Sequence, residues 1–483
     1  MSSNFHKDKV ISADRALKPG GTLRRREFLP RAAAAAGVFT IIPRHVLGGQ
    51  GQSAPSDKLN IAAVGVGGMG QNYMKGCASE NIVAIADVDH EFAAPVFKSY
   101  PGARLYHDYR VLLEKEKGID AVIIGTPDHT HAVVAMAAIQ LRKHVYCAKP
   151  MTRTIHEARA ITKAAREARL ATQMSVQSCA SETACLTAEI IQSGAIGPVR
   201  EVHVWTDRPV WPQGLARPSD TPPVPPHLPW DLWLGPAPLR PYHPIYHPFN
   251  FRGWYDFGTG ALGDMATHTF HVVFTALKLA HPTTVSASVT MVAEPAEPGK
   301  ADPTWSRIRL VRYPETFPHS SIVTWDFPAR EGLPPVRLHW YDGGLKPPRP
   351  ADLDPTVELP AEGSIYVGDK GVLFLRGAGG GSGAKAILNG LLPASKFKDF
   401  TFPPPTLKRT VGHYVEWVQA AKGGPIPNCN FDFACTLTET ALTGCIAQRT
   451  GKTLVWDAQN MRFSNNDEAN QYLNPPARQG WQI

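Results

Sequence analysis

Between residues 58 and 174, short hydrophobic runs alternate with longer segments in which hydrophobic residues recur at helical spacing. The short runs are rich in β-branched residues, as strands are, and lie at 58–66, 81–88, 119–127 and 143–150. Helical spacing is clearest at 131–141 and 154–170. Strands joined by helical crossovers lie parallel in one sheet, so the pattern predicts a parallel sheet covered by helices on both faces.

The pattern changes after residue 177. One helical segment (181–194) and one long strand (199–207) come before a proline-rich stretch from Pro209 to Pro248, in which we expect no regular structure. Alternating runs bounded by turn residues then follow, which predicts a second domain with a largely antiparallel sheet. These runs are 284–294, 320–329, 336–343 and 370–377, and further helices are expected at 411–424 and 436–451.

The first 54 residues have the composition of an export signal. Nine Lys or Arg stand against three Asp or Glu, and an apolar tract follows at 32–42. Arg25 and Arg26, followed by Glu27, Phe28 and Leu29, match the twin-arginine pattern RRxFL. The alternative is a flexible basic tail. We expect export by the twin-arginine machinery, which in a bacterium leads to the periplasm.

Charge and cysteine content narrow the function classes. The leader carries +6 of the formal net charge of +8, so about +2 remains for the rest and gives no electrostatic reason to expect a nucleic-acid partner. The seven cysteines form no CxxC pair, which argues against a zinc ribbon or a thioredoxin-type motif. Disulfides between Cys179 and Cys185, or between Cys429 and Cys435, remain open.

A glycine-rich turn joins the first expected strand to a helix. In GVGGMG, Gly65, Gly67 and Gly70 form the GxGxxG arrangement, with Gly68 and Met69 between them. Such a turn lets the backbone approach a pyrophosphate at a helix N-terminus. Asp87 ends the second strand, where its carboxylate can accept hydrogen bonds from both ribose hydroxyls of NAD and repel the 2′-phosphate of NADP. The glycine-rich turn and Asp87 together predict an NAD site.

Two later strands also end in polar residues at the edge where a cofactor would lie. Thr126, Pro127, Asp128 and His131 belong to GTPDHTHA, and Lys149 belongs to AKP. The two histidines of GTPDHTHA could bind a metal, but the sequence brings no third ligand near them. Lys149 could also be an ordinary surface lysine. We favour a cofactor-side loop and a lysine that faces the same crevice.

The segment 258–277 carries a third set of polar residues. If it is helical from about residue 262, Asp264 and His268 share one face, and His271 lies near that face. Such a triple could hold a metal, could provide acid–base chemistry, or could be a capping Asp with incidental histidines. We assign no metal site to the chain.

Taken together, GVGGMG, TPDHTHA, AKP and GDMATH resemble the glucose-fructose oxidoreductase, inositol dehydrogenase and MocA (Gfo/Idh/MocA) family. The likeness covers nearly everything after Lys58, and YVGDKGVLFL and the ending resemble its exported, twin-arginine branch. The resemblance implies an α/β fold: an N-terminal Rossmann dinucleotide-binding domain and a C-terminal α/β domain whose largely antiparallel open sheet supports oligomerisation. We therefore expect a leader (1–54), an NAD-binding domain (57–176), a substrate and oligomerisation domain (177–460) and a tail (461–483).

The same resemblance implies roles for three residues. Lys149 would hold the substrate hydroxyl, Asp264 would position the sugar or His268, and His268 would take the hydroxyl proton while hydride leaves for nicotinamide. Two positions depart from the family pattern: Ala148 replaces the Glu of its Glu-Lys-Pro motif, and His271 stands where the exported branch often has Asp. Arg252, Trp254, Tyr255 and Asp256 are candidate sugar contacts or loop packing.

Export and NAD dependence together suggest a cofactor that stays bound, because fresh NAD is scarce outside the cytoplasm. We expect an NAD-dependent oxidoreductase that acts on a sugar, polyol or glycoside hydroxyl. A redox-neutral glycosidase or lyase is the alternative within the same chemistry. A non-catalytic sugar-binding protein is the alternative of another class, and it would explain Ala148 without catalysis.

Overall fold

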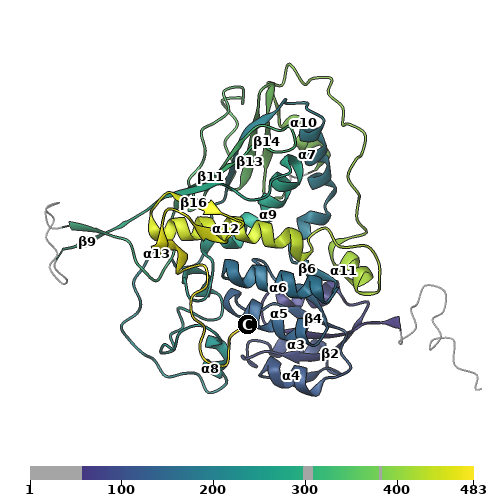
Figure 1. Cartoon of the computed structure of the whole chain (residues 1–483), viewed down its shortest axis with the longest axis vertical. Helices are drawn as coiled ribbons and strands as arrows, with labels where there is room; N and C mark the ends of the chain where they lie inside the picture. The colour runs from purple at the N-terminus through teal and green to yellow at the C-terminus, as the bar shows by residue number, and fades with distance from the viewer. Residues whose placement is uncertain (1–56, 297–307, 380–382) are drawn as a thin grey trace, which may run out of the picture. The chain divides into compact units, whose positions relative to one another are not determined.

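Two β-sheets organise the chain, one built from its first third and the other from the remainder (Figure 1). This computed structural model describes residues 57–296, 308–379 and 383–483, and residues 59–483 form one compact unit. The expected leader, including Arg25 and Arg26, lies outside the described residues.

The first sheet is parallel and six-stranded, in the order β3-β2-β1-β4-β5-β6, as the sequence pattern predicts. The chain order reverses between β1 and β4, so a crevice opens there at the carboxyl ends of the strands. The strands are β1 (Asn60–Val64), β2 (Asn81–Ala86), β3 (Arg104–Tyr106), β4 (Ala121–Ile124), β5 (His144–Cys147) and β6 (Thr172–Met174).

Helices connect these strands: α2 (Gly70–Gly76), α3 (Ala94–Ser99), α4 (Tyr109–Lys115), α5 (His131–Gln140) and α6 (Ile155–Glu167). The start of α6 shows how the sequence fixes a helix end. Thr154 Oγ1 accepts from the backbone N–H of Glu157 (3.2 Å), and the Glu157 carboxylate accepts from the N–H of Thr154 (2.9 Å). This capping box satisfies two N–H groups that the helix leaves free.

The second sheet has nine strands in the order β15-β14-β13-β7-β12-β11-β8-β16-β17. Its pairs are antiparallel except β7 with β12, so the prediction of a largely antiparallel sheet is confirmed. The strands are β7 (Val199–Trp205), β8 (Thr284–Val289), β11 (Ser321–Phe327), β12 (Val336–Tyr341), β13 (Gly363–Gly368), β14 (Gly371–Arg376), β15 (Leu391–Leu392), β16 (Leu454–Asp457) and β17 (Arg462–Phe463).

Helices pack on one face of this sheet. They are α7 (Glu182–Gln192), α9 (Gly260–Leu277), α10 (Ala384–Asn389) and α12 (Phe431–Thr450), with α11 (His413–Ala421) and α13 (Asp467–Asn470) nearby in the chain. Residues alternate along each strand: Val202, Val204 and Leu338 belong to the core beneath the helices, whereas Glu201 and His203 point the other way. We call the face turned away from α9 and α12 the outer face.

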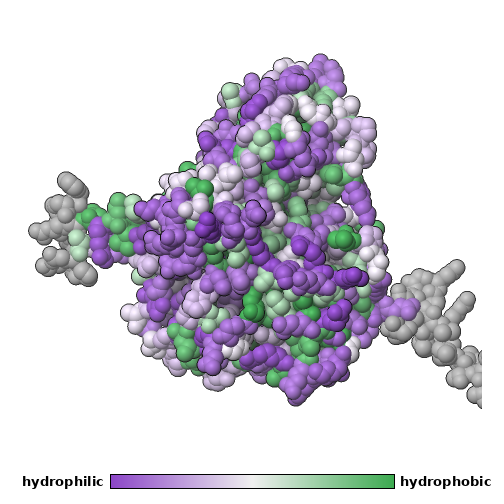
Figure 2. Space-filling view, in the orientation of Figure 1, coloured by the Kyte–Doolittle hydropathy of each residue, from purple (hydrophilic) through white to green (hydrophobic). Residues whose placement is uncertain are grey.

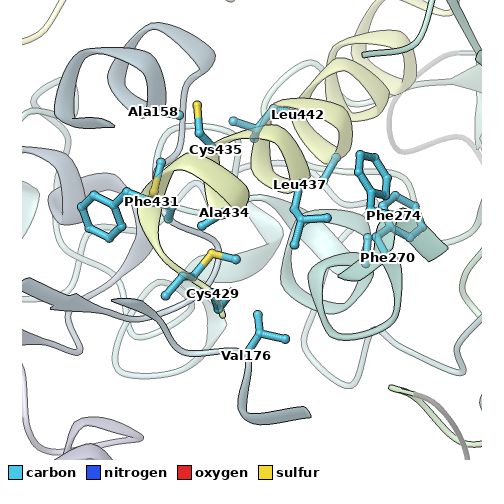
Figure 3. Packing of buried hydrophobic residues seen from close by; sticks show 14 of the residues in the cluster. Ala158, Val176, Phe270, Phe274, Cys429, Phe431, Ala434, Cys435, Leu437 and Leu442 are labelled. Carbon is cyan, nitrogen blue, oxygen red and sulfur yellow. The ribbon is translucent and has the colours of Figure 1, made fainter. Parts of the chain in front are cut away.

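Helix α12 lies between the two sheets and contacts α6, α9 and β8 (Figure 1). Its apolar side chains fill the main core together with residues from α6 and α9, as Figure 3 shows for Phe431, Leu437, Phe270 and Phe274. All seven cysteines are buried free thiols, so neither of the two possible disulfides is formed. Because one core joins both sheets, the loops of the second domain are held firmly against the first.

The proline-rich stretch departs from the prediction at one place. A short helix, α8 (Trp230–Leu234), lies within it. The reason is that no proline occurs between Pro229 and Pro236, and proline is tolerated directly before a helix because the first N–H groups need no helical partner. The indole of Trp230 stacks on that of Trp233, with ring centroids 4.5 Å apart, and both are buried.

One segment projects from the unit as a two-stranded ribbon, β9 (Val292–Pro295) paired with β10 (Ile308–Val311). It exposes Met291, Ile308 and Leu310, and Figure 2 shows hydrophobic side chains gathered there on a face that is otherwise largely hydrophilic.

Among the described residues, no helix combines the length and apolar character that crossing a bilayer requires.

Candidate active site

A cavity of about 430 Å³ opens at the carboxyl edge of the parallel sheet. The turns after β1, β2, β4 and β5 provide its floor, through Gly65, Asp87, Thr126 and Lys149 among others. Side chains from distant segments close it over: Leu232, Trp233, His247, Phe249, Phe251, Arg252 and Trp481. The volume falls within the range of small-molecule and cofactor sites.

The glycine turn has the backbone that close approach to a ligand requires. Gly65 has φ +76°, and a Cβ there would lie 2.6 Å from the backbone nitrogen of Thr126. A Cβ on Gly70 would meet the carbonyl oxygen of Gly65, so the third glycine lets α2 pack against the strand end. Gly68 has open space around its Cβ position and lines the cavity with Gly67 and Met69.

Asp87 braces this turn from the end of β2. Its Oδ2 accepts from the N–H groups of Val66 (2.7 Å) and Gly67 (3.2 Å), and its Oδ1 accepts from Asp89 N–H (3.0 Å). Burial raises the pKa of this carboxyl, and the three N–H donors oppose that shift. Asp87 also lines the cavity, so the residue that shapes the glycine turn faces any nucleotide bound there.

The turn after β4 contributes Thr126, Pro127 and Asp128 to the wall. Thr126 Oγ1 is buried and has no hydrogen-bond partner among the described residues, which leaves a free polar group at the cavity. Asp128 Oδ2 accepts from Thr259 Oγ1 at 2.8 Å, which ties this turn to the start of α9.

His131, expected at the cofactor, is not among the residues that line the cavity. Its ring is fully buried between two carbonyl oxygens, with Nε2 2.8 Å from Thr126 O and Nδ1 2.8 Å from Pro150 O. The ring therefore joins the turns that follow β4 and β5. This contact positions Thr126 and Lys149 relative to each other. His131 thus affects the expected cofactor site only through these two residues.

Lys149, Asp264 and Arg252 form an ion-pair cluster beside the cavity, which Lys149 and Arg252 line. The Lys149 ammonium lies 2.8 Å from Asp264 Oδ1 and donates to the Asp264 backbone oxygen at 2.9 Å. Arg252 Nε donates to the same Oδ1 at 3.1 Å. Burial alone would raise the pKa of Asp264, but the two cations hold it below its usual value, so this carboxylate stays charged.

His268 follows Asp264 by one turn of α9, as expected, but it does not line the cavity. Burial lowers the pKa of His268 to about 3, and the nearby Lys149 ammonium adds to the effect. Burial also lowers the pKa of His271 to about 3, with His268 as the next cause. Both imidazoles are therefore neutral near pH 7.

Of the four candidate sugar contacts, Arg252 lines the cavity and the other three do not. The turn Asn250–Gly253 carries Arg252 at the cavity wall, and the chain then enters the core. Trp254 is fully buried against Tyr246, Tyr255 packs on Phe317, and Asp256 pairs with Arg240. Of the two interpretations given for these positions, sugar contact or loop packing, the three residues therefore fit loop packing.

Several lining residues belong to no motif recognised in the sequence. They include Phe92, His107, Tyr109, Trp233, His247, Phe249 and Trp481. Trp481 packs beside Tyr109, with Arg110 4.3 Å from its ring centroid, so the tail reaches back to the first domain. An aromatic residue in a polar tail was the available signal, although its packing partner lies 372 residues earlier in a segment with no motif.

Comparison with known families agrees with this architecture. Residues 59–176 match the oxidoreductase family model with an NAD-binding Rossmann fold, and residues 203–316 and 369–483 match the C-terminal α/β domain model of the same family. This chain belongs to the Gfo/Idh/MocA oxidoreductase family. The family is one of NAD-binding oxidoreductases, and this chain is related at low identity to sugar and inositol dehydrogenases.

Curated relatives match parts of this Gfo/Idh/MocA chain. Levoglucosan dehydrogenase of Pseudarthrobacter phenanthrenivorans is 25% identical over 221 residues, which cover 44% of this chain and 49% of that protein. Inositol 2-dehydrogenase 1 of Saccharopolyspora erythraea is 32% identical over 100 residues, which cover 20% and 30%. The matches thus span about half or less of these relatives.

Solved structures share the fold over most of the chain. The WlbA dehydrogenase from Bordetella pertussis, in complex with NADH and UDP-GlcNAcA, has a TM-score of 0.53 at 17% identity and covers 83% of this chain and 99% of its own. A levoglucosan dehydrogenase in complex with NADH and L-sorbose has a TM-score of 0.52 at 18% identity, with 82% and 98% covered.

Proposed function

We propose that this protein oxidises a hydroxyl group of a sugar, polyol or glycoside by hydride transfer to an NAD molecule that it retains. The observation that carries the proposal is the Lys149 ammonium, which pairs with Asp264 and lines the same cavity as the glycine turn. This arrangement joins a charge-stabilising donor to a dinucleotide cradle in one cavity.

The residues of the cavity fit NAD. The N–H groups of the glycine turn suit a pyrophosphate, the Asp87 carboxylate suits ribose hydroxyls, and the unpartnered Thr126 Oγ1 offers one further hydrogen bond. Bound NAD would supply the hydride acceptor, and the hydride would come from the carbon that carries the reacting hydroxyl.

Lys149 would act on the substrate oxygen. An ammonium has three N–H donors, and Asp264 Oδ1 and Asp264 O account for two of them. The third can hold the reacting hydroxyl and stabilise the negative charge that develops as its proton leaves. Arg252 shares Asp264 and lines the cavity, so it can bind a neighbouring hydroxyl of the same substrate.

His268 is the proposed proton acceptor; because it does not line the cavity, this role requires the wall beside Lys149 to shift, or a water to relay the proton, when substrate binds. Its imidazole is neutral because burial and Lys149 lower its pKa to about 3, so it retains a nitrogen lone pair near pH 7. Asp264 lies one turn away on α9, and its negative charge raises the pKa of His268 against the larger effect of burial. Asp264 would thus orient Lys149 and support the protonated imidazole.

Retention of the cofactor is supported by the side chains that cover the cavity. Trp233, Phe249 and Trp481 come from three separate segments and all line the cavity, so a large bound ligand could contact protein on more than one side. A retained NAD must be re-oxidised in place, which leaves two routes: reduction of a second sugar, or return of the hydride after elimination or glycosidic cleavage.

We also propose that residues 1–54 direct export of the folded protein to the periplasm through the twin-arginine machinery. The support is the Arg25–Arg26 pair ahead of the apolar tract. Replacement of both by Lys should leave the protein in the cytoplasmic fraction of cells. Appearance of that variant in the periplasm at the normal level would refute this proposal.

The outer face of the nine-stranded sheet supports a homo-oligomer. Its partly exposed apolar residues include Ile322, Val367 and Val372. Light scattering on the purified protein should give a mass that is a multiple of that of one chain. A monomer at micromolar concentration would contradict this expectation.

The decisive test is to purify the protein without added cofactor, denature it and assay the supernatant for NAD(H). About one equivalent per chain, followed by reduction of that NAD on addition of sugars, polyols or glycosides, supports the proposal. Products with no net redox change would indicate the lyase or glycosidase route. Bound NAD that no such compound reduces would favour the sugar-binding alternative, and absence of NAD would refute retention.

A matched pair of variants isolates retention. Trp481→Ala should speed NAD dissociation about 10-fold, because it opens the packing around Tyr109 and Arg110. The exposed neighbour Gln482 provides the control substitution to Ala. Equal dissociation rates in the two variants, measured by fluorescence of bound NADH, would show that the tail does not hold the cofactor.

A further inference from the structure

Three potential metal ligands meet on the outer face, away from the cofactor cavity. Glu201 and His203 lie on β7, and His339 lies on β12. Strands β7 and β12 form the one parallel pair among the described pairs of the nine-stranded sheet, and His203 and His339 are direct partners in its register. None of the three lines the cavity described above.

The three ligand atoms converge. Glu201 Oε1 lies 3.3 Å from His203 Nε2 and 3.0 Å from His339 Nε2, and all three atoms lie within 4.8 Å of one another. The two imidazoles stack with centroids 4.9 Å apart and planes 11° from parallel, so at least one ring must turn about its Cβ–Cγ bond to aim its in-plane lone pair at a shared ion. Zinc bonds of about 2.0–2.1 Å set neighbouring tetrahedral ligands about 3.3–3.4 Å apart, close to the two distances from Glu201 Oε1.

The opposite nitrogens of both rings are already oriented. His203 Nδ1 lies 3.0 Å from the hydroxyl of Tyr341, and His339 Nδ1 lies 2.9 Å from Thr324 Oγ1. When Nδ1–H donates to such an oxygen, Nε2 carries the lone pair and faces the metal. Nε2 of His339 has no hydrogen bond of normal geometry within the described chain, although Glu201 Oε1 is near.

The site is open to solvent on one side. Glu201 is 43% exposed, so an ion could reach the site from solvent, and the nearby Arg337 is paired with Asp326 at 2.8 Å.

We propose that Glu201, His203 and His339 bind one divalent transition-metal ion, zinc by the chemistry of the donors, with a fourth position open to water. Two imidazoles and one carboxylate suit zinc and its first-row neighbours, whereas magnesium and calcium take oxygen ligands. The ion would join β7 to β12 across the parallel pair. This proposal is independent of the hydride-transfer proposal and of NAD binding.

The test uses untagged protein, treated with EDTA and dialysed, and titrated with zinc chloride in competition with a chromophoric chelator. Wild type should bind one equivalent. His339→Gln and Glu201→Gln should each weaken binding at least 100-fold. Arg337→Gln, which removes a cation opposite Glu201 on the same face of β12 without removing a ligand, should bind zinc at least as tightly as wild type does.

Cobalt(II) provides a second readout that needs no variant. Four-coordinate cobalt absorbs visible light far more strongly than the hydrated ion, so one intense spectrum per equivalent, abolished by added zinc, supports the site. Binding in wild type that is no tighter than in His339→Gln, or a cobalt spectrum of the hydrated type only, would overturn the proposal and leave an ordinary ion-paired histidine pair.

Discussion

The two sheets carry their polar groups in different places. Helices cover both faces of the parallel sheet, so its polar residues lie at the carboxyl edge, in turns after β1, β2, β4 and β5. The nine-stranded sheet has an outer face, and polar residues such as Glu201 and His203 occupy alternate positions along its strands. At the edge, the polar residues come together because they lie in neighbouring loops. On the face, they come together because the register of paired strands places them side by side.

This difference sets what a substitution does. A turn at the sheet edge has backbone conformations that few residue types adopt. The cofactor site at this edge depends on those backbone conformations. A position on the outer face is ordinary strand backbone, and its chemistry depends on the side chain alone. The four predictions below test this contrast, from the largest expected effect to the smallest.

Loss of the ammonium at the edge should have the largest effect. Lys149→Ala should reduce hydride transfer about 10³-fold, because no other group would hold the developing charge on the substrate oxygen. Bound NAD should remain, as assayed after denaturation. Lys163→Ala provides the control, since that lysine is exposed and pairs with Glu167 at 2.8 Å. A wild-type rate in Lys149→Ala would remove this lysine from the mechanism.

Backbone strain at the edge should be next. Gly65→Ala should lower the free energy of unfolding by about 3 kcal/mol, because alanine is disfavoured at φ +76° and its Cβ would press on Thr126. Gly68→Ala, three residues away with open space around its Cβ position, should change it by less than about 0.5 kcal/mol. Urea unfolding without NAD measures both. Equal values would show that the turn tolerates side chains.

The covered side of the parallel sheet should respond to acid. Burial lowers the pKa of His413 to about 3 from 6.5, and Gln173 Nε2 lies 3.1 Å from its Nδ1. Between pH 3 and pH 6.5 the folded state therefore binds fewer protons than the unfolded state. The neutral His413 contributes its full stability above pH 6.5, and this contribution is lost as the pH falls.

Wild type loses stability between pH 7.5 and pH 5, and His413→Gln should make this loss smaller by about 2 kcal/mol. Unfolding free energies of the two proteins at both pH values measure this difference. His319→Gln, at an exposed loop position, is the matched control. An unchanged pH dependence in His413→Gln would show that this imidazole is not held neutral by burial.

The smallest effect is expected on the outer face. Thr324→Val keeps a β-branched side chain but removes the oxygen at His339 Nδ1, so zinc affinity should fall about 10-fold. Thr284→Val, which removes a hydroxyl bonded to Asp326 instead, should leave it unchanged. The same competition titration measures both variants. Equal affinity in wild type and Thr324→Val would mean that the threonine does not orient the ring.

The contrast between edge and face also explains which features the sequence predicted. The parallel strands and the edge residues Gly65, Asp87, Thr126 and Lys149 follow motifs in which chemistry and turn are contiguous. Helix α9 carries Asp264 and His268 one turn apart for the same reason. Local patterns therefore predicted both sheets and the floor of the cavity.

Features that depend on long-range packing were not predictable. Trp233, Phe249 and Trp481 cover the cavity only because one core fixes their segments against the first domain. The histidine pair on the outer face depends on the register of β7 with β12, which the sequence does not reveal. The burial of Trp254 also follows from the path of its loop, since the aromatic residue alone suits either a core or a sugar site.

The position of Trp481 has a consequence for biosynthesis. The parallel sheet and its glycine turn are complete after about a third of the chain has been translated, but the wall of the cavity needs residue 481. A growing chain on the ribosome thus carries an open cleft. The wall is complete only after translation has passed that tryptophan, so we expect tight binding of a nucleotide only once residue 481 has been made.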